Sequence, residues 1–302
     1  MRNNKTNRVV KTLKKQSGFT LIELMISLAL GVAISWVVLD VSLNAMRNSR
    51  DIVATGDVME KGLYLGDLLK REIKNTGFYG RVASAKMSGD AAPGMCSSTP
   101  TLNHLRHPLY GINNVSSQQL CSGDDLLEGS DVLMIRRAST AISPNSLVAN
   151  QHYVQSNFDT VNIATGTAAN FSLKEMDGTV PAPIHQFYHD VYYVDNYKNF
   201  KRRRFVNGSH TIEPLIEGVD DFQLEFAYDT DNDNIADSFG GVPTTTENWR
   251  NTKTVTVSLL ISGQGVSQNN TIDYAYAGET KSFSDGKKRR LFSFVVAIGN
   301  QF

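Results

Sequence analysis

The hydrophobic pattern of the chain changes abruptly near its amino terminus. Residues 1–18 are polar and basic, whereas residues 19–39 carry a single charge, at Glu23. As a helix with a rise of about 1.5 Å per residue, the second segment is long enough to cross a hydrocarbon core of roughly 30 Å. The sequence therefore predicts a transmembrane helix over residues 19–39.

The carboxylate of Glu23 is unusual inside this apolar run. Placing an ionised side chain near the centre of a bilayer costs about 2.5–3.5 kcal/mol on insertion scales, and such acids usually have a partner. The sequence therefore predicts a partner for Glu23. An ordinary cleaved signal peptide is the alternative, because Ala33-Ile34-Ser35 offers small residues in suitable places, but its apolar stretch would be unusually interrupted.

After Asp40 the apolar spacing becomes that of an amphipathic helix. Gly77, which follows several basic residues, is a typical stop signal. We therefore predict that the helix continues through residues 40–76 and presents one stripe to a globular body. The stripe consists of Ile52, Met59, Leu63, Leu65, Leu68, Leu69 and Ile73.

Strand patterns dominate the rest of the chain. Residues 219–229 alternate apolar and polar side chains, which predicts an antiparallel strand with one face in water. Residues 81–125 lack such periodicity and predict a long loop or several short elements. A helix packed on an antiparallel sheet gives an α+β fold, with a β-rich globular domain at residues 77–302. Further strands are predicted at residues 129–138, 186–194, 202–208, 252–262 and 290–300.

Positive charge is concentrated before the apolar run. The chain has 30 basic and 30 acidic residues, and the first 18 residues hold six basic and no acidic ones, which leaves 24 basic against 30 acidic in the remainder. By the positive-inside rule, we expect residues 1–18 to stay in the cytoplasm and the chain after Asp40 to be translocated. The mildly acidic remainder argues against a body that binds polyanions.

Two basic runs, Lys201–Arg204 and Lys287–Arg290, are the exceptions in that body. They could neutralise phosphates, but both flank predicted strands, where solvated turns or charge-protected sheet edges explain them more simply. We therefore do not expect nucleic-acid binding. The chain also lacks a nucleophile elbow, a phosphate-binding glycine loop and a convincing acid pair, so no enzyme is predicted.

The two cysteines, Cys96 and Cys121, are 25 residues apart and match no metal-ligand spacing. They are either one disulfide or two buried thiols. The disulfide requires an exported body, because a reducing cytosol would keep both thiols free.

An acidic segment, "YDTDNDNIADS", contains the strongest chemical pattern of the body. Its carboxylates are a candidate calcium site, because a tight loop can bring several hard oxygens to about 2.3–2.6 Å from the ion. The pattern departs from an EF-hand loop, since Asn234 and Gly240 stand where glycine and a bidentate glutamate are usual. The alternative is a solvated turn whose side chains bond only to its own backbone. The four candidate ligands are Asp229, Asp231, Asp233 and Asp237.

The segment "GFTLIELMIS" resembles the signature of type IV prepilins. The resemblance implies that a prepilin peptidase cleaves between Gly18 and Phe19 and that the new amino terminus, Phe19, is N-methylated. It also implies that Glu23 meets the positively charged amino terminus of a neighbouring subunit in a filament. Opposite charges about 4 Å apart gain roughly 4 kcal/mol at an effective dielectric constant near 20, which offsets part of the burial cost.

Two further segments, "REIKNTGFYG" and "GSDVLMIRRA", resemble PilW-like minor pilins. In that family a cysteine often follows the Gly-aromatic-Gly segment, but this chain has Arg81 there, so the pairing of Cys96 with Cys121 cannot be copied from the family. PilW-like proteins also frequently carry an Asp-rich loop in this region.

The resemblance implies a subunit for the assembly or initiation of a type IV pilus. Its expected partners are other major and minor pilins through their amino-terminal helices, the prepilin peptidase and the inner-membrane assembly platform. We expect a single-pass inner-membrane protein with a periplasmic body, which later joins the surface fibre. A pseudopilin of type II secretion and a membrane-tethered calcium-dependent adhesin are the alternatives.

Overall fold

The computed structural model describes residues 18–82, 94–97, 101–116, 120–143, 146–266 and 271–300. Its contacts divide the chain into two compact units, residues 1–52 and residues 53–302. Helix α1 (Leu21–Lys74) contributes residues to both units. The carboxyl-terminal part of the helix is therefore part of the compact body, and most of the predicted leader lies outside the described residues.

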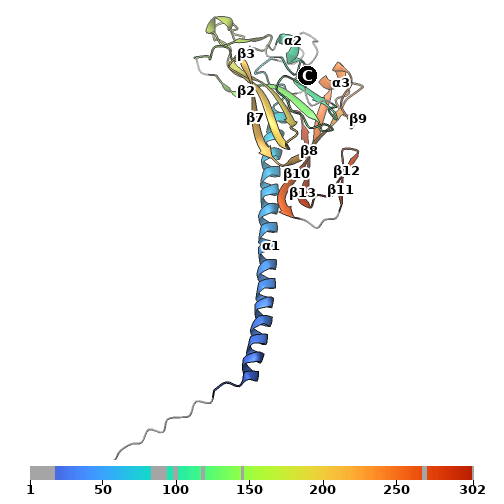
Figure 1. The fold of residues 1–302 in the computed structure, drawn as a ribbon. Coiled ribbons are helices and arrows are strands. Elements are labelled where there is room, and N and C mark those ends of the chain that lie inside the picture. The colour runs from blue at the N-terminus through green and yellow to red at the C-terminus, as the bar shows by residue number, and fades with distance from the viewer. Residues whose placement is uncertain are drawn as a thin grey trace, which may run out of the picture. The chain divides into compact units, whose positions relative to one another are not determined.

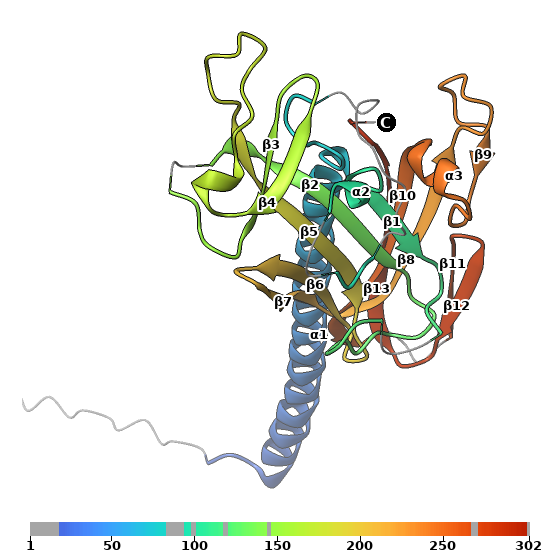
Figure 2. The ribbon, with the colours of Figure 1, turned by 90° about the horizontal axis from the view of Figure 1, so that it is seen from above.

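The body contains two antiparallel sheets and a separate hairpin, which Figure 2 shows around α1. The larger sheet has the order β1-β2-β5-β3-β4, and β6 and β7 extend it from β5. Its strands are β1 (Leu109–Ile112), β2 (Val132–Ile142), β3 (His152–Ser156), β4 (Val161–Thr165), β5 (Ile184–Val194), β6 (Asn199–Val206) and β7 (Ser209–Glu217). The smaller sheet has the order β13-β10-β8-β9. Its strands are β8 (Val219–Tyr228), β9 (Ser238–Phe239), β10 (Thr252–Val266) and β13 (Lys287–Ala297).

The hairpin and three short helical segments complete the body. The hairpin consists of β11 (Ile272–Tyr276) and β12 (Glu279–Phe283), and the helical segments are α2 (Leu102–Leu105), the 3-10 helix η2 (Ala168–Asn170) and α3 (Thr246–Arg250). The six strands predicted from the sequence correspond to β2, β5, β6, β8, β10 and β13. The α+β class is therefore confirmed.

The main core lies between α1 and both sheets. Leu65, Leu69 and Ile73 of α1 are fully buried there, together with Leu133 of β2 and Phe222 of β8. Burying one such side chain contributes about 1.5–3 kcal/mol. The helix and the two sheets thus share one core, which explains why the helix residues from Val53 onward belong to the compact body.

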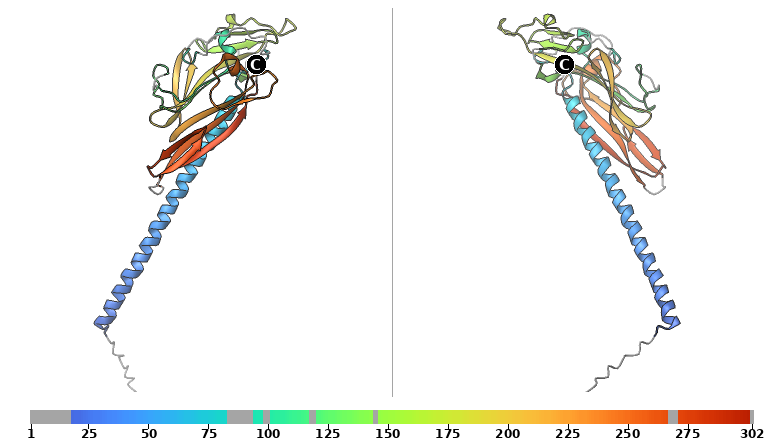
Figure 3. Two further views of the ribbon diagram at one scale, coloured as in Figure 1. Left: turned by 90° about the vertical axis from the view of Figure 1, so that its right-hand side faces the viewer. Right: turned by 60° about the vertical axis from the view of Figure 1, so that its left-hand side comes forward.

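The predicted apolar stripe on α1 was wrong at two positions. Ile52 and Leu63 are 73% and 65% exposed, and small residues make the closest contacts instead. A Cβ atom on Gly62 would lie 2.2 Å from the ring of Phe292, and one on Gly263 would lie 2.7 Å from Val58. Figure 3 shows β10 and β13 running alongside this part of the helix. Close approach of the sheet to the helix selects glycine rather than large apolar side chains at these points.

Strand β8 also differs from its prediction. The alternating pattern predicted one face in water, but Asp221 and Gln223 are buried as well as the apolar residues. The hairpin covers that face: Asp221 accepts a hydrogen bond from the Tyr276 hydroxyl at 2.7 Å and pairs with Lys281 at 2.7 Å. Asp221 and Gln223 therefore bond to protein groups rather than to water.

Helix α1 ends at Lys74, two residues before the end that the sequence predicts. Gly77 adopts a positive φ of 76°, and its N–H donates to the carbonyl oxygen of Arg136 in β2 at 3.0 Å. Gly80 has a φ of 92°, and a Cβ there would lie 2.3 Å from Oγ of Ser156. That hydroxyl donates to the Tyr79 carbonyl at 2.7 Å. The two glycines of "GFYG" thus let the chain leave the helix and attach to the larger sheet.

Candidate functional site

The start of α1 brings together the residues of the predicted processing and assembly site. Gly18 and Phe19 precede the helix and are exposed, Phe19 by 91%. The backbone N–H and the hydroxyl of Thr20 both donate to Oε2 of Glu23 at 2.9 Å. The N–H of Glu23 reaches Oγ1 of Thr20 at 3.4 Å. Thr20 and Glu23 therefore form a capping box, which satisfies donors at the start of the helix.

The capping box refines the expectation that Glu23 depends on a neighbouring chain. Within one subunit its Oε2 already has two donors, whereas its Oε1 accepts no hydrogen bond from the described residues. The spacing Thr-x-x-Glu directly before an apolar run is a sequence signal for this motif. The local role of Thr20 was thus predictable but was missed.

The apolar segment that follows is exposed along its whole length. Of the described helices, α1 is long and apolar enough to cross a membrane, with a mean hydropathy of 2.2 over its most apolar 18-residue window, none of it buried. Because an exposed apolar surface of this size is strongly unfavourable in water, the segment needs lipid or other apolar helices around it. The helix indicates a membrane anchor.

The cysteines are joined. Cys96 and Cys121 form a disulfide whose Cα atoms are 5.6 Å apart, so of the two alternatives the disulfide is confirmed. It lies beside a cluster on the other face of the larger sheet, where Met95 packs with Met134 and Tyr193. The bond thus attaches the segment around Met95 to the body.

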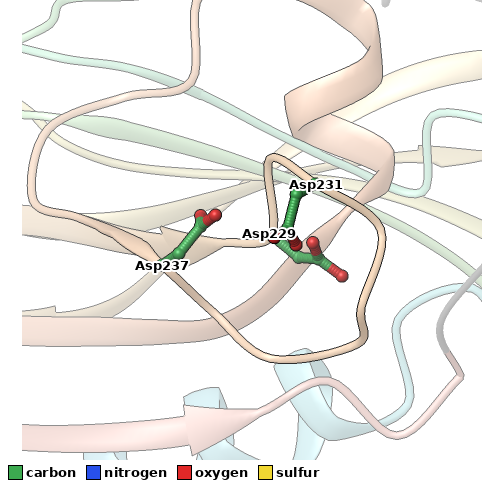
Figure 4. A group of neighbouring side chains, drawn as sticks. All are labelled: Asp229, Asp231 and Asp237. Carbon is green, nitrogen blue, oxygen red and sulfur yellow. The ribbon is translucent and has the colours of Figure 1, made fainter.

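The acidic loop between β8 and β9 brings three of its four predicted ligands together. Carboxylate oxygens of Asp229, Asp231 and Asp237 lie within 4.8 Å of one another, and Asp233 lies outside this group. Figure 4 shows these three side chains around the loop. Asn234 has a φ of 70°, so it adopts the left-handed conformation that glycine usually supplies at this position.

The same carboxylates also stabilise the loop itself. Asp229 accepts N–H bonds from Asn232 at 2.6 Å and Asn234 at 2.7 Å, and Lys253 Nζ lies 3.6 Å from its Oδ2. Burial raises the pKa of Asp229, but these N–H donors and Lys253 outweigh it and hold the pKa below its ordinary value. Asp237 accepts two bonds from Thr230. The carboxylate oxygens are ligands of the type that calcium prefers, but Lys253 already supplies a positive charge there.

The first basic run is neutralised inside the body. Each of its four side chains pairs with a carboxylate of another segment: Lys201 with Asp195, Arg202 with Glu213, Arg203 with Asp124 and Arg204 with Asp190. Three of these carboxylates are buried. The run therefore has a structural role in the larger sheet.

The second basic run is only partly neutralised. Arg289 pairs with Asp220 and Asp285, and Lys288 lies 3.4 Å from Oγ1 of Thr55. Lys287 and Arg290 are exposed and form no salt bridge with another described residue. This run therefore presents positive charge at the start of β13.

A buried pair at the end of α1 was missed by sequence reasoning. Glu72 is 4% exposed and accepts two hydrogen bonds from Arg137 of β2, at 2.6 and 3.0 Å. The guanidinium also lies 4.7 Å from the ring centre of Tyr188. Arg137 stands within the predicted strand at residues 129–138, but nothing local in the sequence pairs it with a residue 65 positions earlier.

Comparison with known proteins relates these features to families. Residues 13–39 match the model of the prokaryotic N-terminal methylation motif, and residues 191–300 match that of type IV pilus-assembly protein W. The chain is thus similar to prepilins at its amino terminus and to PilW-like minor pilins over residues 191–300. The second match runs from within β5 to the end of β13, so it covers the smaller sheet, the acidic loop and both basic runs.

Two other comparisons are less informative. No curated protein matches the chain. A type IV-like pilin from Thermus thermophilus is similar at 12% identity and a TM-score of 0.38, covering 80% of this chain and 97% of its own.

Proposed function

We propose that this PilW-like minor pilin is cleaved between Gly18 and Phe19 by a prepilin peptidase and then joins a type IV pilus through α1. The observation that carries the proposal is the arrangement at the start of α1. An exposed Gly-Phe junction directly precedes a capped helix whose apolar residues before Asp40 are exposed in the subunit. Such a helix suits storage in a membrane and later packing among other helices.

Orientation in the membrane follows from charge. The six basic residues before Gly18 favour a cytoplasmic leader and a periplasmic body. The disulfide between Cys96 and Cys121 supports this orientation, because disulfides persist in oxidising compartments such as the periplasm. The inner-membrane assembly platform is then the partner that extracts the processed subunit.

Glu23 acts in this proposal through its second carboxylate oxygen. Oε2 accepts the hydrogen bonds from Thr20, and Oε1 accepts a hydrogen bond from the amino group of Phe19 of a neighbouring subunit. In an apolar environment this charge pair is worth more than in water, and it favours one register between helices. The role is structural, in the assembly or initiation of the fibre.

Substitution of Gly18 by alanine tests the processing step. We expect Gly18→Ala to leave an uncleaved membrane form that is absent from sheared fibres. Mass spectrometry of wild-type fibres should find a peptide that begins with methylated Phe19. Surface display that survives in Gly18→Ala would instead indicate a tethered adhesin, and processed protein outside sheared pili would indicate a type II secretion pseudopilin.

Substitution of Glu23 by glutamine tests the assembly step. Glutamine retains an oxygen for Thr20, so the capping box persists while the charge is removed. We expect processing to continue and the amount of protein in fibres to fall about tenfold. Asp40→Asn is the matched control, because it removes a charge from the same helix beyond the apolar run. Unchanged incorporation of Glu23→Gln would contradict the proposed pairing.

A further inference from the structure

Strand β13 forms one edge of the smaller sheet. It pairs with β10 along its length, and no described strand pairs with its other side. The opposite edge, β9, has two residues, whereas β13 has 11. Figure 1 labels both strands. Unpaired N–H and C=O groups along a long edge are a template for another strand, so proteins usually cover or blunt such edges.

The positive charges of β13 protect only part of this edge. Lys287–Arg290 occupy its first four positions, and residues 291–297 carry no charge. Apolar residues alternate on its two faces: Phe292 and Phe294 point toward Gly62 and Gly66 of α1, and Val295, on the other face, is 64% exposed. The uncharged part of the edge is therefore open to pairing.

A groove runs beside the same part of the edge. It has a volume of about 620 Å³ and lies between α1 and β13 within the compact body. Leu63, Gly66 and Phe294 form much of its apolar lining, and Asp67 and Lys70 lie along its helix side. An added strand places every second side chain on the helix face of the sheet, so its side chains would enter this groove.

We propose that the outer edge of β13 binds a β-strand of a neighbouring pilin subunit. The incoming strand has apolar side chains on the face that enters the groove, and acidic residues opposite Lys287 and Arg290. Backbone hydrogen bonds supply affinity, and the groove and the basic end supply specificity. A helix does not satisfy this edge, because its own backbone groups are bonded internally. The proposal rests on the proposed function, which supplies the neighbouring subunits.

Site-specific photocrosslinking in piliated cells tests the proposal. A photoreactive amino acid is placed at Leu63, in the groove, and separately at Val295, on the opposite face. Both positions are exposed, so the fold should tolerate the change. We expect both to link to one short segment of another pilin. The residues reached from Leu63 and from Val295 should be an odd number of positions apart in that segment, because adjacent residues of a strand face opposite ways. Ile142, which is 67% exposed at the end of β2, is the control and should not link to that segment.

Charge reversal provides a second measurement. In Lys287→Glu/Arg290→Glu we expect crosslinking from Val295 to fall at least fivefold while thermal unfolding of the purified protein is unchanged. Links to a helical segment, links from one face only, or none at all would overturn the proposal. The proposed function would still stand in those cases if the same fibres contain the peptide that begins at Phe19. Absence of that peptide would overturn the proposed function, and with it the proposed pairing.

Discussion

The basic runs Lys201–Arg204 and Lys287–Arg290 have nearly the same sequence but different surroundings. In the larger sheet, all four side chains of the first run pair with carboxylates, three of which are buried. In the smaller sheet, the second run begins an edge strand, and Lys287 and Arg290 face outward without a salt bridge among the described residues. The position of the partners therefore decides whether a basic run is structural or available for binding.

The two sheets also differ in how far they are covered by the rest of the body. Strands β2 and β5 are buried on both faces, with Leu133 and Tyr192 in the main core and Met134 and Val191 in the cluster beside the disulfide. The smaller sheet has a helix on one face, and none of the described strands pairs with the outer edge of β13. We therefore expect substitutions in the larger sheet to affect stability and those along β13 to affect binding.

Removal of a buried partner should produce the largest effect. Arg203 is 4% exposed, and its Nε lies 3.1 Å from Oδ1 of Asp124. Asp124→Ala leaves this guanidinium buried without its counter-charge, which typically costs about 3–5 kcal/mol. We expect a loss of that size in the free energy of unfolding, measured by urea denaturation of the purified protein in detergent.

The matched control is in the second run. Lys287→Ala removes an exposed charge with no salt bridge to a described residue, so its effect should stay within about 0.5 kcal/mol. Comparable losses in the two variants would show that the two runs do not differ in role.

Two glycines with positive φ allow the cost of backbone strain to be distinguished from the cost of a steric contact. Gly80, in the segment that follows α1, has a φ of 92°, and a Cβ there would lie 2.3 Å from Oγ of Ser156. Gly278, in the β11–β12 turn, has a φ of 75° and open space around that position. Gly→Ala at such a φ costs about 1–2 kcal/mol, and the contact adds to this at Gly80. We expect losses of about 2–3 kcal/mol for Gly80→Ala and about 1 kcal/mol for Gly278→Ala.

Urea denaturation of Gly80→Ala and Gly278→Ala measures the difference between their free energies of unfolding. Ser156→Ala in the Gly80→Ala background provides the double-mutant cycle. If the contact with Ser156 adds nothing, the two glycine variants will lose the same free energy.

Acid should destabilise the larger sheet selectively, because all six histidines lie between residues 104 and 210. Burial, with a contribution from the Arg136 cation and three other histidines, lowers the pKa of His189 well below its ordinary 6.5. Stability from this neutral side chain is present above pH 6.5 and is lost as the pH falls, because only the unfolded chain then takes up the proton. At pH 5 the loss reaches at most about 2 kcal/mol.

Burial also raises the pKa of Asp131 to about 7, and this group acts with the opposite sign. Its protonation in the folded state adds stability as the pH falls below 7. Unfolding should therefore be followed from pH 7.5 to 5 in an Asp131→Asn background, with and without His189→Phe. We expect the free energy of unfolding to fall less on acidification in the His189→Phe variant. An identical pH dependence would exclude His189 as a cause.

The sequence predicts the helix, the residues at the start of α1 and six of the seven described strands that have eight or more residues, because these depend on local periodicity and motifs. It does not predict the pairing of Glu72 with Arg137 or of Arg203 with Asp124, because these residues are 65 and 79 positions apart. Strand β7 was missed, and so were the short strands β1, β3 and β4, whose four or five residues carry little periodic signal. The prediction of one solvated face for β8 was wrong because a hairpin from far along the chain covers it.

The acidic loop between β8 and β9 should show the smallest effect. If three carboxylates and water coordinate calcium with the weak affinity of extracellular modules, 10 mM calcium should stabilise the protein by about 1 kcal/mol, and magnesium by less. Substitution of Asp231 is the most informative test, because this residue is exposed and, unlike Asp229, does not pair with Lys253. Asp231→Ala should remove the response to calcium and lower stability in its absence by at most about 0.5 kcal/mol, as measured by thermal unfolding, because Asp231 accepts one exposed N–H bond, from Asp233 at 3.3 Å. Wild-type protein that is indifferent to calcium would leave the loop as a turn held by its own N–H bonds and by Lys253. Its charges would then be satisfied internally, like those of the first basic run, and β13 would be the open part of the smaller sheet.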